Sequence, residues 1–577
     1  MRRWLLVVQS LALSALLLCP APGGYGMRAI GSPDADTAKH LWTLWWMRRE
    51  ALSGEPGLLT RMSNFPEGIQ LYPIDPLDGL FSLLVPLPPV PLANVLAFVH
   101  LTLLGLAAGW LGRLVSGSRL GGYVAGALAQ GSAFAAFSLH VGIGELRQLW
   151  WVPLGLGCLI RALDSGERRW FAALSAACAG AALSCFYHGA FLGLSATIVL
   201  LGTPARRPNA RLGAALALAL SLVPAAFAAR TFAGSYGPGA DPAALVTEEG
   251  GVAVDDAGAA AAVEDLYLPR AWARETLTAT ERAYTGGRYL GLLAVGLALA
   301  GVAAAPRRAA PWAAAAAVGA VLALGSAPAA GGVLGTWGLP FAWLNALLAR
   351  VAEPVNFPAR FLAITMVALP VLASLATRWR WTALLVPLAV AEIQLGDLVP
   401  WPRETTSLPP VRGLSGRGAF LDLGLALDDS RASRLLNITV QMALASPTQA
   451  VPIDRIDRWN AGGSRWVRAL PLVQDRVHRR HAKPSEYRPD LALIRDRGFE
   501  RILVTHPTDG LDPQYEGLLT ALCGPPQRST VATLWTLPPA DAAPDELSAW
   551  KAEHAVRVAA LPAEETPGTY PTSPALQ

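Results

Sequence analysis

Two acidic residues, Asp34 and Asp36, stand two positions apart in a polar segment that follows the first apolar run of the chain. A carboxylate can take a proton from an attacking hydroxyl group, and a pair of carboxylates can hold Mg²⁺ or Mn²⁺ through oxygen ligands. The same residue types are common in the first turn of a helix, where Asp36 would act as a cap. Both interpretations, a catalytic base with its partner or two helix-start residues, stay open at this point.

Other polar residues stand beside apolar runs and are candidates for binding substrate. Asp75 lies between prolines in Tyr-Pro-Ile-Asp-Pro, a pattern also typical of capped turns. His140 and Glu145 share a short polar turn, and His188 lies in a tight turn between two apolar runs. His140 and Glu145 can line a groove for a donor or an acceptor, or they can simply be residues of an interfacial turn. His188 can reach the substrate or hydrogen-bond to carbonyl groups of its loop. Arg360, where an apolar run begins, can bind a lipid phosphate or extend toward the interface as an ordinary snorkelling arginine.

The composition indicates the environment that must position these residues. Of 577 residues, 53% are hydrophobic and 15% are charged, and the mean hydropathy is +0.37. Water-soluble domains carry about 25% charged residues, so we expect an integral membrane protein. The net charge of +5 comes from scattered arginines, which argues against a nucleic-acid partner. The five cysteines form no Cys-x-x-Cys pair, and the chain lacks the phosphate-loop, zinc-protease and serine-hydrolase motifs.

Apolar runs predict about 11 transmembrane helices, with boundaries uncertain by several residues. They are 4–20, 92–112, 120–139, 149–163, 170–186, 189–203, 212–229, 288–305, 309–326, 359–377 and 381–399. With a cytoplasmic N-terminus, the inside segments hold 14 arginines against two acids. The positive-inside rule therefore places the long polar segments outside the cytoplasm.

This orientation predicts three parts of the chain. Residues 1–399 form the transmembrane domain, whose first extracytoplasmic loop, 21–91, carries an amphipathic helix with Trp42, Trp45 and Trp46 at the membrane surface. Residues 400–540 form an extracytoplasmic α/β domain, with strands at 419–427, 501–505 and 530–537. Residues 541–577 form a partly disordered tail rich in Pro and Ala.

The first loop resembles that of the polytopic GT-C glycosyltransferases, which include protein O-mannosyltransferases and aminoarabinose transferases. The similarity lies in Asp34-Ala-Asp36 directly after the first span, the tryptophan-rich helix, and the later Pro-Glu-Gly and Tyr-Pro-Ile-Asp-Pro-Leu stretches. The stretch Val355-Asn-Phe-Pro-Ala-Arg-Phe361 is similar to one in bacterial members with an outside C-terminal domain. The resemblance implies that an acid of the first outside loop acts at the catalytic centre. It also implies a polyprenyl-phosphate sugar as donor, with or without a metal ion.

We therefore expect a bacterial inner-membrane glycosyltransferase of the GT-C type, catalysing hexosyl or pentosyl transfer to an envelope acceptor. Asp36 is the expected base, with Asp34 as its partner or as a ligand of Mg²⁺ or Mn²⁺, and Arg360 is expected to bind the lipid phosphate. The alternative is a transporter or a non-enzymatic assembly factor for envelope polysaccharide or lipid. The predicted spans are nearly free of charge and the polar residues gather on one face, which disfavours transport.

Overall fold

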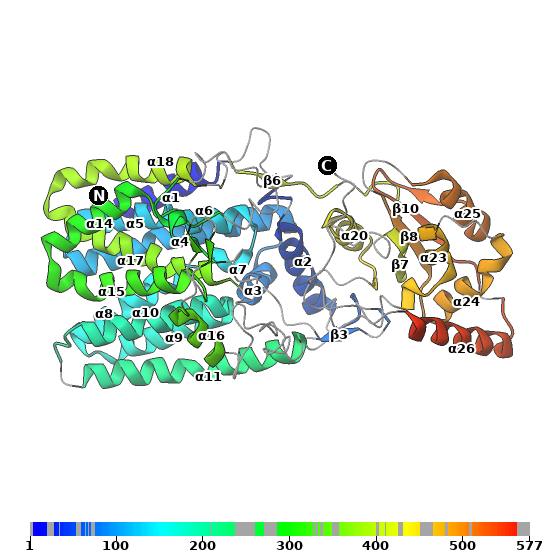
Figure 1. Cartoon of the computed structure of the whole chain (residues 1–577), viewed down its shortest axis with the longest axis horizontal. Coiled ribbons are helices and arrows are strands. Elements are labelled where there is room, and N and C mark those ends of the chain that lie inside the picture. Colours follow the sequence, from blue (N-terminus) through cyan, green and yellow to red (C-terminus); the bar gives the residue numbers. More distant parts are fainter. Residues whose placement is uncertain are drawn as a thin grey trace. The chain divides into compact units, whose positions relative to one another are not determined.

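The computed structural model of the chain is shown in Figure 1. It describes residues 4–19, 28–33, 35–53, 59–63, 65–66, 68–70, 75–207, 209–236, 260–269, 286–326, 329–330, 333–334, 338–348, 357–397, 399, 403–409, 411–424, 431–449, 466–478, 483–506, 511–539 and 541–561. The chain divides into two compact units. The larger, helical unit comprises Met1–Arg48, Pro73–Gly234 and Pro238–Ser407, and the smaller comprises Arg49–Tyr72, Ser235–Gly237 and Leu408–Gln577.

The helical unit is built around α4 (Pro89–Ser116), which packs against α5 (Arg119–Gln130), α17 (Leu362–Leu375) and α1 (Leu5–Leu17). Small residues bring the backbones of α4 and α5 together. A Cβ atom on Gly126 would lie 2.7 Å from the carbonyl oxygen of Gly105, and one on Gly122 would lie 2.8 Å from that of Gly109. Each helix thus presents two glycines four positions apart, a pattern that allows close packing where the surroundings are apolar.

The remaining helices of this unit surround that pair. They are α2 (Thr37–Ser53, which extends past the unit's boundary), α3 (Pro76–Leu84), α6 (Ala133–His140), α7 (Gly144–Arg147), α8 (Trp151–Ser165), α9 (Arg168–Ser184), α10 (Phe186–Gly202), α11 (Ala210–Tyr236), η2 (Glu264–Leu266), α14 (Leu292–Ala304), α15 (Pro306–Ala323), α16 (Pro340–Leu348), η4 (Pro358–Phe361), η5 (Ala376–Arg378), η6 (Arg380–Leu385) and α18 (Val386–Gly396).

Every predicted span overlaps a helix, although 120–139 is divided into α5 and α6 at Gly131-Ser132 and the helix within 288–305 begins only at Leu292. Among the described residues, two helices, Pro89–Ser116 and Pro358–Arg378, are long and apolar enough to cross a bilayer, and the other apolar helices are shorter. The number of crossings and their orientation stay predictions.

Short strands order the loops of the helical unit. β1 (Ala29–Ile30) pairs antiparallel with β6 (Thr405–Thr406), so the start of the first loop is tied to the segment after α18. A second short pair joins β4 (Ala329–Ala330) to β5 (Val333–Leu334).

The predicted amphipathic helix is present as α2, but its environment differs from the expectation. Trp42 and Trp46 are buried and their rings stack 5.6 Å apart, nearly parallel. A tryptophan that only marked a membrane interface would leave one edge of its ring to the lipid headgroups. These two rings belong to a packed interior instead.

The smaller unit contains a four-stranded sheet in the order β7-β8-β10-β9, together with a short β2–β3 pair (Leu59–Thr60 and Ile69–Gln70). The strands of the sheet are β7 (Phe420–Asp422), β8 (Arg501–Thr505), β9 (Gln527–Arg528) and β10 (Ala532–Thr536), and only the β7–β8 pair is parallel. The helices are α20 (Arg431–Leu444), α23 (Pro471–His478), η7 (Pro484–Tyr487), α24 (Arg488–Asp496), α25 (Pro513–Cys523) and α26 (Pro544–Ala560). All three predicted strands of this region overlap observed ones, and the extracytoplasmic position of the unit stays a prediction.

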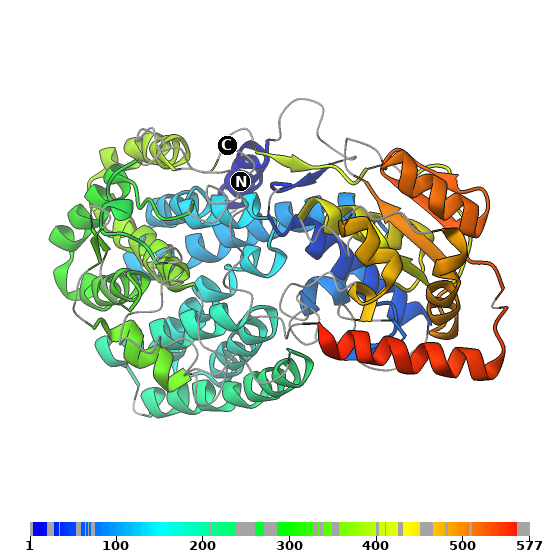
Figure 2. The same cartoon turned by 45° about the vertical axis from the view of Figure 1, so that its right-hand side comes forward.

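Residues assigned to the tail contain a further helix. α26 begins at Pro544 and runs beside α24 (Figure 2). It buries His554 against Trp466, with the ring centroids 5.0 Å apart. The domain thus continues beyond residue 540 to the end of α26, and residues 562–577 of the expected tail lie outside the described residues.

Candidate active site

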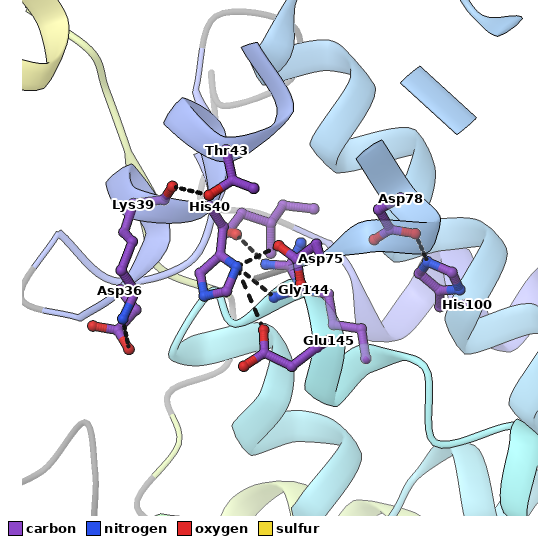
Figure 3. A network of polar contacts seen from close by, with 11 residues as sticks. Asp36, Lys39, His40, Thr43, Asp75, Asp78, His100, Gly144 and Glu145 are labelled. Carbon is purple, nitrogen blue, oxygen red and sulfur yellow. Dashed lines mark hydrogen bonds and ion pairs between the residues drawn. The ribbon is translucent and has the colours of Figure 1, made fainter. Parts of the chain in front are cut away.

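Three side chains that are far apart in the sequence meet where α2, α3 and α7 converge in the helical unit (Figure 3). His40 comes from the first turns of α2, Asp75 directly precedes α3, and Glu145 lies on the single turn of α7. One ligand atom from each lies within 4.8 Å of the others. We call this group the His40–Asp75–Glu145 cluster.

Backbone contacts at the end of α6 position the helix that carries His40. The N–H groups of Ser32 and Asp36 donate to the carbonyl oxygens of His140 (2.6 Å) and Val141 (3.2 Å). The turn then passes through Gly142, whose φ of +67° is favourable only for glycine. A Cβ atom on Gly142 would also lie 2.1 Å from the hydroxyl oxygen of Thr37, so a larger residue would displace the start of α2.

Hydrogen bonds and charge link the members of the cluster. His40 Nδ1 bonds to Asp75 Oδ2 and lies 3.5 Å from Glu145 Oε2. Burial by itself would lower the pKa of His40, but the nearby carboxylates of Asp75 and Glu145 outweigh it and raise that pKa above 6.5. Burial would raise the pKa of Asp75, yet the charge of His40 and the hydrogen bonds from His40 and Glu145 outweigh burial and lower that pKa.

The pKa of Glu145 is also displaced from its ordinary value. Burial, together with the adjacent Asp75 carboxylate, raises the pKa of Glu145 to about 8, in spite of the opposing effect of His40. Perturbed carboxyl groups of this kind concentrate at functional sites because active sites need groups that titrate near the working pH. The buried guanidinium of Arg147, which donates to the carbonyl oxygen of Ile30 over 2.9 Å, supplies positive charge nearby.

The cluster fits a small divalent cation. His40 Nε2, Asp75 Oδ1 and Glu145 Oε2 are buried and have no hydrogen-bond partner among the described residues. Buried polar atoms without a partner are costly and call for an explanation. The adjoining cavity of about 10 Å³, lined by His40, Asp75 and Arg147 among others, has room for one small ion or water. Two carboxylates and an imidazole suit Mn²⁺ well, and the oxygen ligands also suit Mg²⁺.

A second polar chain lies next to the cluster. The indole N–H of Trp150 donates to His100 Nδ1 over 3.1 Å, and His100 Nε2 bonds to Asp78 Oδ1 over 2.8 Å. Because His100 accepts at Nδ1, it must be protonated at Nε2 and donate to Asp78. Asp78 Oδ1 is thereby paired with His100, whereas Asp75 is the carboxylate of this segment that belongs to the cluster.

The structure brings together two of the predicted binding residues, Asp75 and Glu145. Asp36 lies one turn before His40, is partly exposed, and forms an ion pair with Lys39 over 2.9 Å (Figure 3). Among the described residues, the candidate metal ligands are therefore the members of the cluster, and Asp36 is not one of them. Asp34 lies outside the described residues. His140 is buried, with Nδ1 3.8 Å from Glu404 Oε2.

Arg360 and His188 lie close enough to each other to interact electrostatically. The Arg360 guanidinium packs over the rings of Tyr187 (4.7 Å) and Phe357 (4.3 Å), and its Nε has no hydrogen-bond partner among the described residues. Within the same described set, neither ring nitrogen of the fully buried His188 has a partner. Cys185 lies within electrostatic range of both Glu145 and Arg360, which places Arg360 in the same region of the helical unit as the cluster.

Sequence reasoning missed His40, Arg147 and the pairing of Asp78 with His100. A signal for His40 was available, because it follows Asp36 by four positions and so lies on the same face of the helix. The contact between Asp78 and His100 joins segments 22 residues apart, and the spacing of neither residue indicates it.

No known protein family matches the sequence, and no curated protein matches it. Among solved structures, the chain is similar to the cryo-EM structure of the arabinofuranosyltransferase AftD from Mycobacteria, with a TM-score of 0.51 and 14% identity. The match covers 93% of this chain and 40% of AftD. The chain has the fold of a GT-C glycosyltransferase.

Two further structures were matched. A mutant of AftD gives a TM-score of 0.50 and 14% identity, over 93% of this chain and 42% of that one. The archaeal oligosaccharyltransferase AglB from Archaeoglobus fulgidus, solved with an inhibitory peptide and a dolichol-phosphate, gives 0.44 and 13%, over 87% and 69%. The expected GT-C resemblance is confirmed at the level of the fold, and this chain spans about two fifths of the length of AftD.

Proposed function

We propose that the protein is a membrane glycosyltransferase that moves a sugar from a lipid-phosphate donor to an acceptor outside the cytoplasm. The observation that carries this proposal is the buried His40–Asp75–Glu145 cluster, which adjoins the first loop of a GT-C fold. Structural packing alone does not account for a buried group of three ionisable side chains in which each keeps a polar atom without a hydrogen-bond partner among the described residues.

In the proposed reaction, the acceptor hydroxyl oxygen attacks the anomeric carbon of the donor sugar. The bond between that carbon and the phosphate oxygen breaks, and the lipid phosphate leaves with the bonding electrons. Asp36 takes the proton of the hydroxyl group, because its carboxylate is partly exposed at the start of α2, one turn from the cluster. Asp34 stays the proposed partner of this base.

The other residues bind and orient the donor phosphate. His40, Asp75 and Glu145 would hold a divalent cation, which stabilises negative charge on a phosphate oxygen. Arg360 offers a planar guanidinium suited to bidentate pairing with phosphate, and its two aromatic neighbours hold that group in place. His188 of α10 and His140 at the end of α6 are also proposed to contact the substrate.

The proposal also includes the donor, the membrane and the acceptor. The donor is a polyprenyl-phosphate sugar, the membrane is the bacterial inner membrane with the N-terminus in the cytoplasm, and the acceptor belongs to the cell envelope. We propose that the smaller unit lies outside the cytoplasm and helps to bind this acceptor.

The test compares wild type with Asp36→Asn and Asp75→Asn in membranes supplied with a panel of radiolabelled polyprenyl-phosphate sugars. Both variants should lose transfer by about 100-fold or more, the usual contribution of a positioned proton acceptor or of a charge-stabilising group. Asp164→Asn is the matched control, because Asp164 pairs with Arg206 on a connection between helices away from the cluster. Variants that transfer sugar and complement a deletion as well as wild type would leave a non-enzymatic assembly factor as the explanation.

A further inference from the structure

A cavity of about 520 Å³ opens at the end of the helical unit away from the candidate active site. α4 links the two places: Ala93 and Leu96 line the small cavity beside His40, and Ser116 lines the large one. At 1.5 Å per residue, the 20 residues from Leu96 to Ser116 separate them by about 30 Å. The large cavity is therefore separate from the candidate active site.

Three connections between helices contribute to the walls of this cavity. The end of α4 and the turn into α5 supply Ser116 and Ser118, the junction of α14 and α15 supplies residues 304–308, and the end of α17 with η5 supplies Leu375, Thr377 and Arg378. All three connections belong to the segments that the distribution of arginines assigns to the cytoplasmic side.

Positive charge in the cavity is uncompensated by protein. Arg307, Arg308 and Arg378 line it, and within the described part of the chain no acidic side chain pairs with any of them. The two acids of the predicted inside segments already pair elsewhere: Asp164 with Arg206 at 3.2 Å and Glu167 with Arg169 at 2.7 Å. Arg307 and Arg308 also occupy the first turn of α15, where the helix dipole disfavours a cation unless an anion is bound nearby.

Hydroxyl groups and apolar walls complete the lining. The Ser118 hydroxyl accepts from the Gly121 N–H, so its own proton is available for a ligand. The hydroxyls of Ser116 and Thr377 donate to backbone carbonyl oxygens of their own segments. The donors that remain, three guanidinium groups and one hydroxyl, match the oxygens of a phosphate group.

We infer that this cavity binds the phosphate of an anionic lipid headgroup. A lipid is favoured over free phosphate because the cavity wall includes apolar residues such as Leu375, and because Trp379 and Trp381 beside it are exposed, as in an aromatic belt at a membrane interface. Basic pockets between helices on the cytoplasmic side are suited to such headgroups.

The test measures binding to the purified full chain in neutral detergent, with dihexanoyl phosphatidylglycerol, dihexanoyl phosphatidylcholine and sodium phosphate as separate probes. Phosphatidylglycerol should bind wild type, and the variant Arg307→Gln/Arg308→Gln/Arg378→Gln should bind it at least about tenfold more weakly, as expected when charge-assisted hydrogen bonds are lost. The control Arg168→Gln/Arg207→Gln/Arg211→Gln removes the same charge from neighbouring connections and should bind like wild type.

The single variants Arg307→Gln and Arg378→Gln cover the case in which the triple variant does not fold, since both side chains are exposed. Each should weaken phosphatidylglycerol binding in the same direction. Phosphate that binds as tightly as phosphatidylglycerol would overturn the lipid assignment and identify free phosphate as the ligand of this cavity. Equal binding of the two lipids, or wild-type affinity in the variants, would overturn the site itself.

Discussion

Replacing Gly144 by alanine tests the cation site without removing any proposed ligand. A Cβ atom at this position would lie 2.7 Å from Asp75 Oδ2 and 2.9 Å from both Asp75 Cγ and Oδ1. Ordinary contacts require the carboxyl group to retreat by roughly 0.5–1 Å. Since the carboxyl group ends a flexible side chain, the fold can accept this movement. Alanine also favours the helical conformation of α7 by up to about 1 kcal/mol over glycine.

We therefore expect Gly144→Ala to keep the thermal stability of wild type while its affinity for Mn²⁺ falls. Disturbing the groups that orient metal ligands typically costs about 10–100-fold in affinity. The assay is electron paramagnetic resonance of free Mn²⁺ titrated with purified protein. Gly193→Ala is the matched control, because a Cβ atom on Gly193 of α10 meets nothing within 4 Å. Wild-type affinity in Gly144→Ala, or no Mn²⁺ binding by wild type, would refute the placement of the cation between these residues.

Three further predictions concern pH, packing and the donor phosphate. Because Glu145 has a pKa of about 8 in the fold against a usual 4.5, its stabilising contribution is complete below pH 4.5 and is lost as the pH rises toward 8. The melting temperature of wild type, measured without divalent cations, should thus fall relative to Glu145→Gln over this range, and parallel curves would contradict the assignment. Gly301→Ala should lower the free energy of unfolding by about 1–3 kcal/mol or more, since its Cβ would lie 1.8 Å from the Leu372 carbonyl oxygen. The control is Gly296→Ala on the same helix, whose Cβ meets nothing within 4 Å, so its melting temperature should equal that of wild type or lie slightly higher. Arg360→Gln should raise the KM for the lipid donor by about tenfold or more, with partial rescue by Arg360→Lys, whereas an unchanged KM would make Arg360 an ordinary interfacial residue.

Local patterns in the sequence predict most of the helices and strands. The strand 501–505 is found at its predicted bounds, since it is a short apolar pattern. α26 was missed because prolines and acids suggested a disordered tail. Its alanines and charged residues favour a helix, and the contact of His554 with Trp466 anchors it, which no local pattern reveals.

The candidate site was predictable residue by residue but not as a group. Asp75 and Glu145 attract attention because they are acids beside apolar runs, yet they are 70 positions apart in the sequence, which hides their contact with His40. That contact depends on how α2 is held against the end of α6, and therefore on tertiary structure. Asp36 attracts attention for its spacing to Asp34, and only the structure shows that its partner is Lys39.

The pairing of β1 with β6 joins a segment near the start of the helical unit to the segment at its end in the sequence. Residues 403–406 hold both the end of α1, through the Arg403 N–H bond to the Cys19 carbonyl oxygen, and the start of the first loop, through the Gly31 N–H bond to Glu404. The longest segment of the smaller unit begins directly after these residues, at Leu408. Because β6 pairs with β1, a displacement of residues 405–406 would act directly on residues 29–30, which precede α2 in the chain.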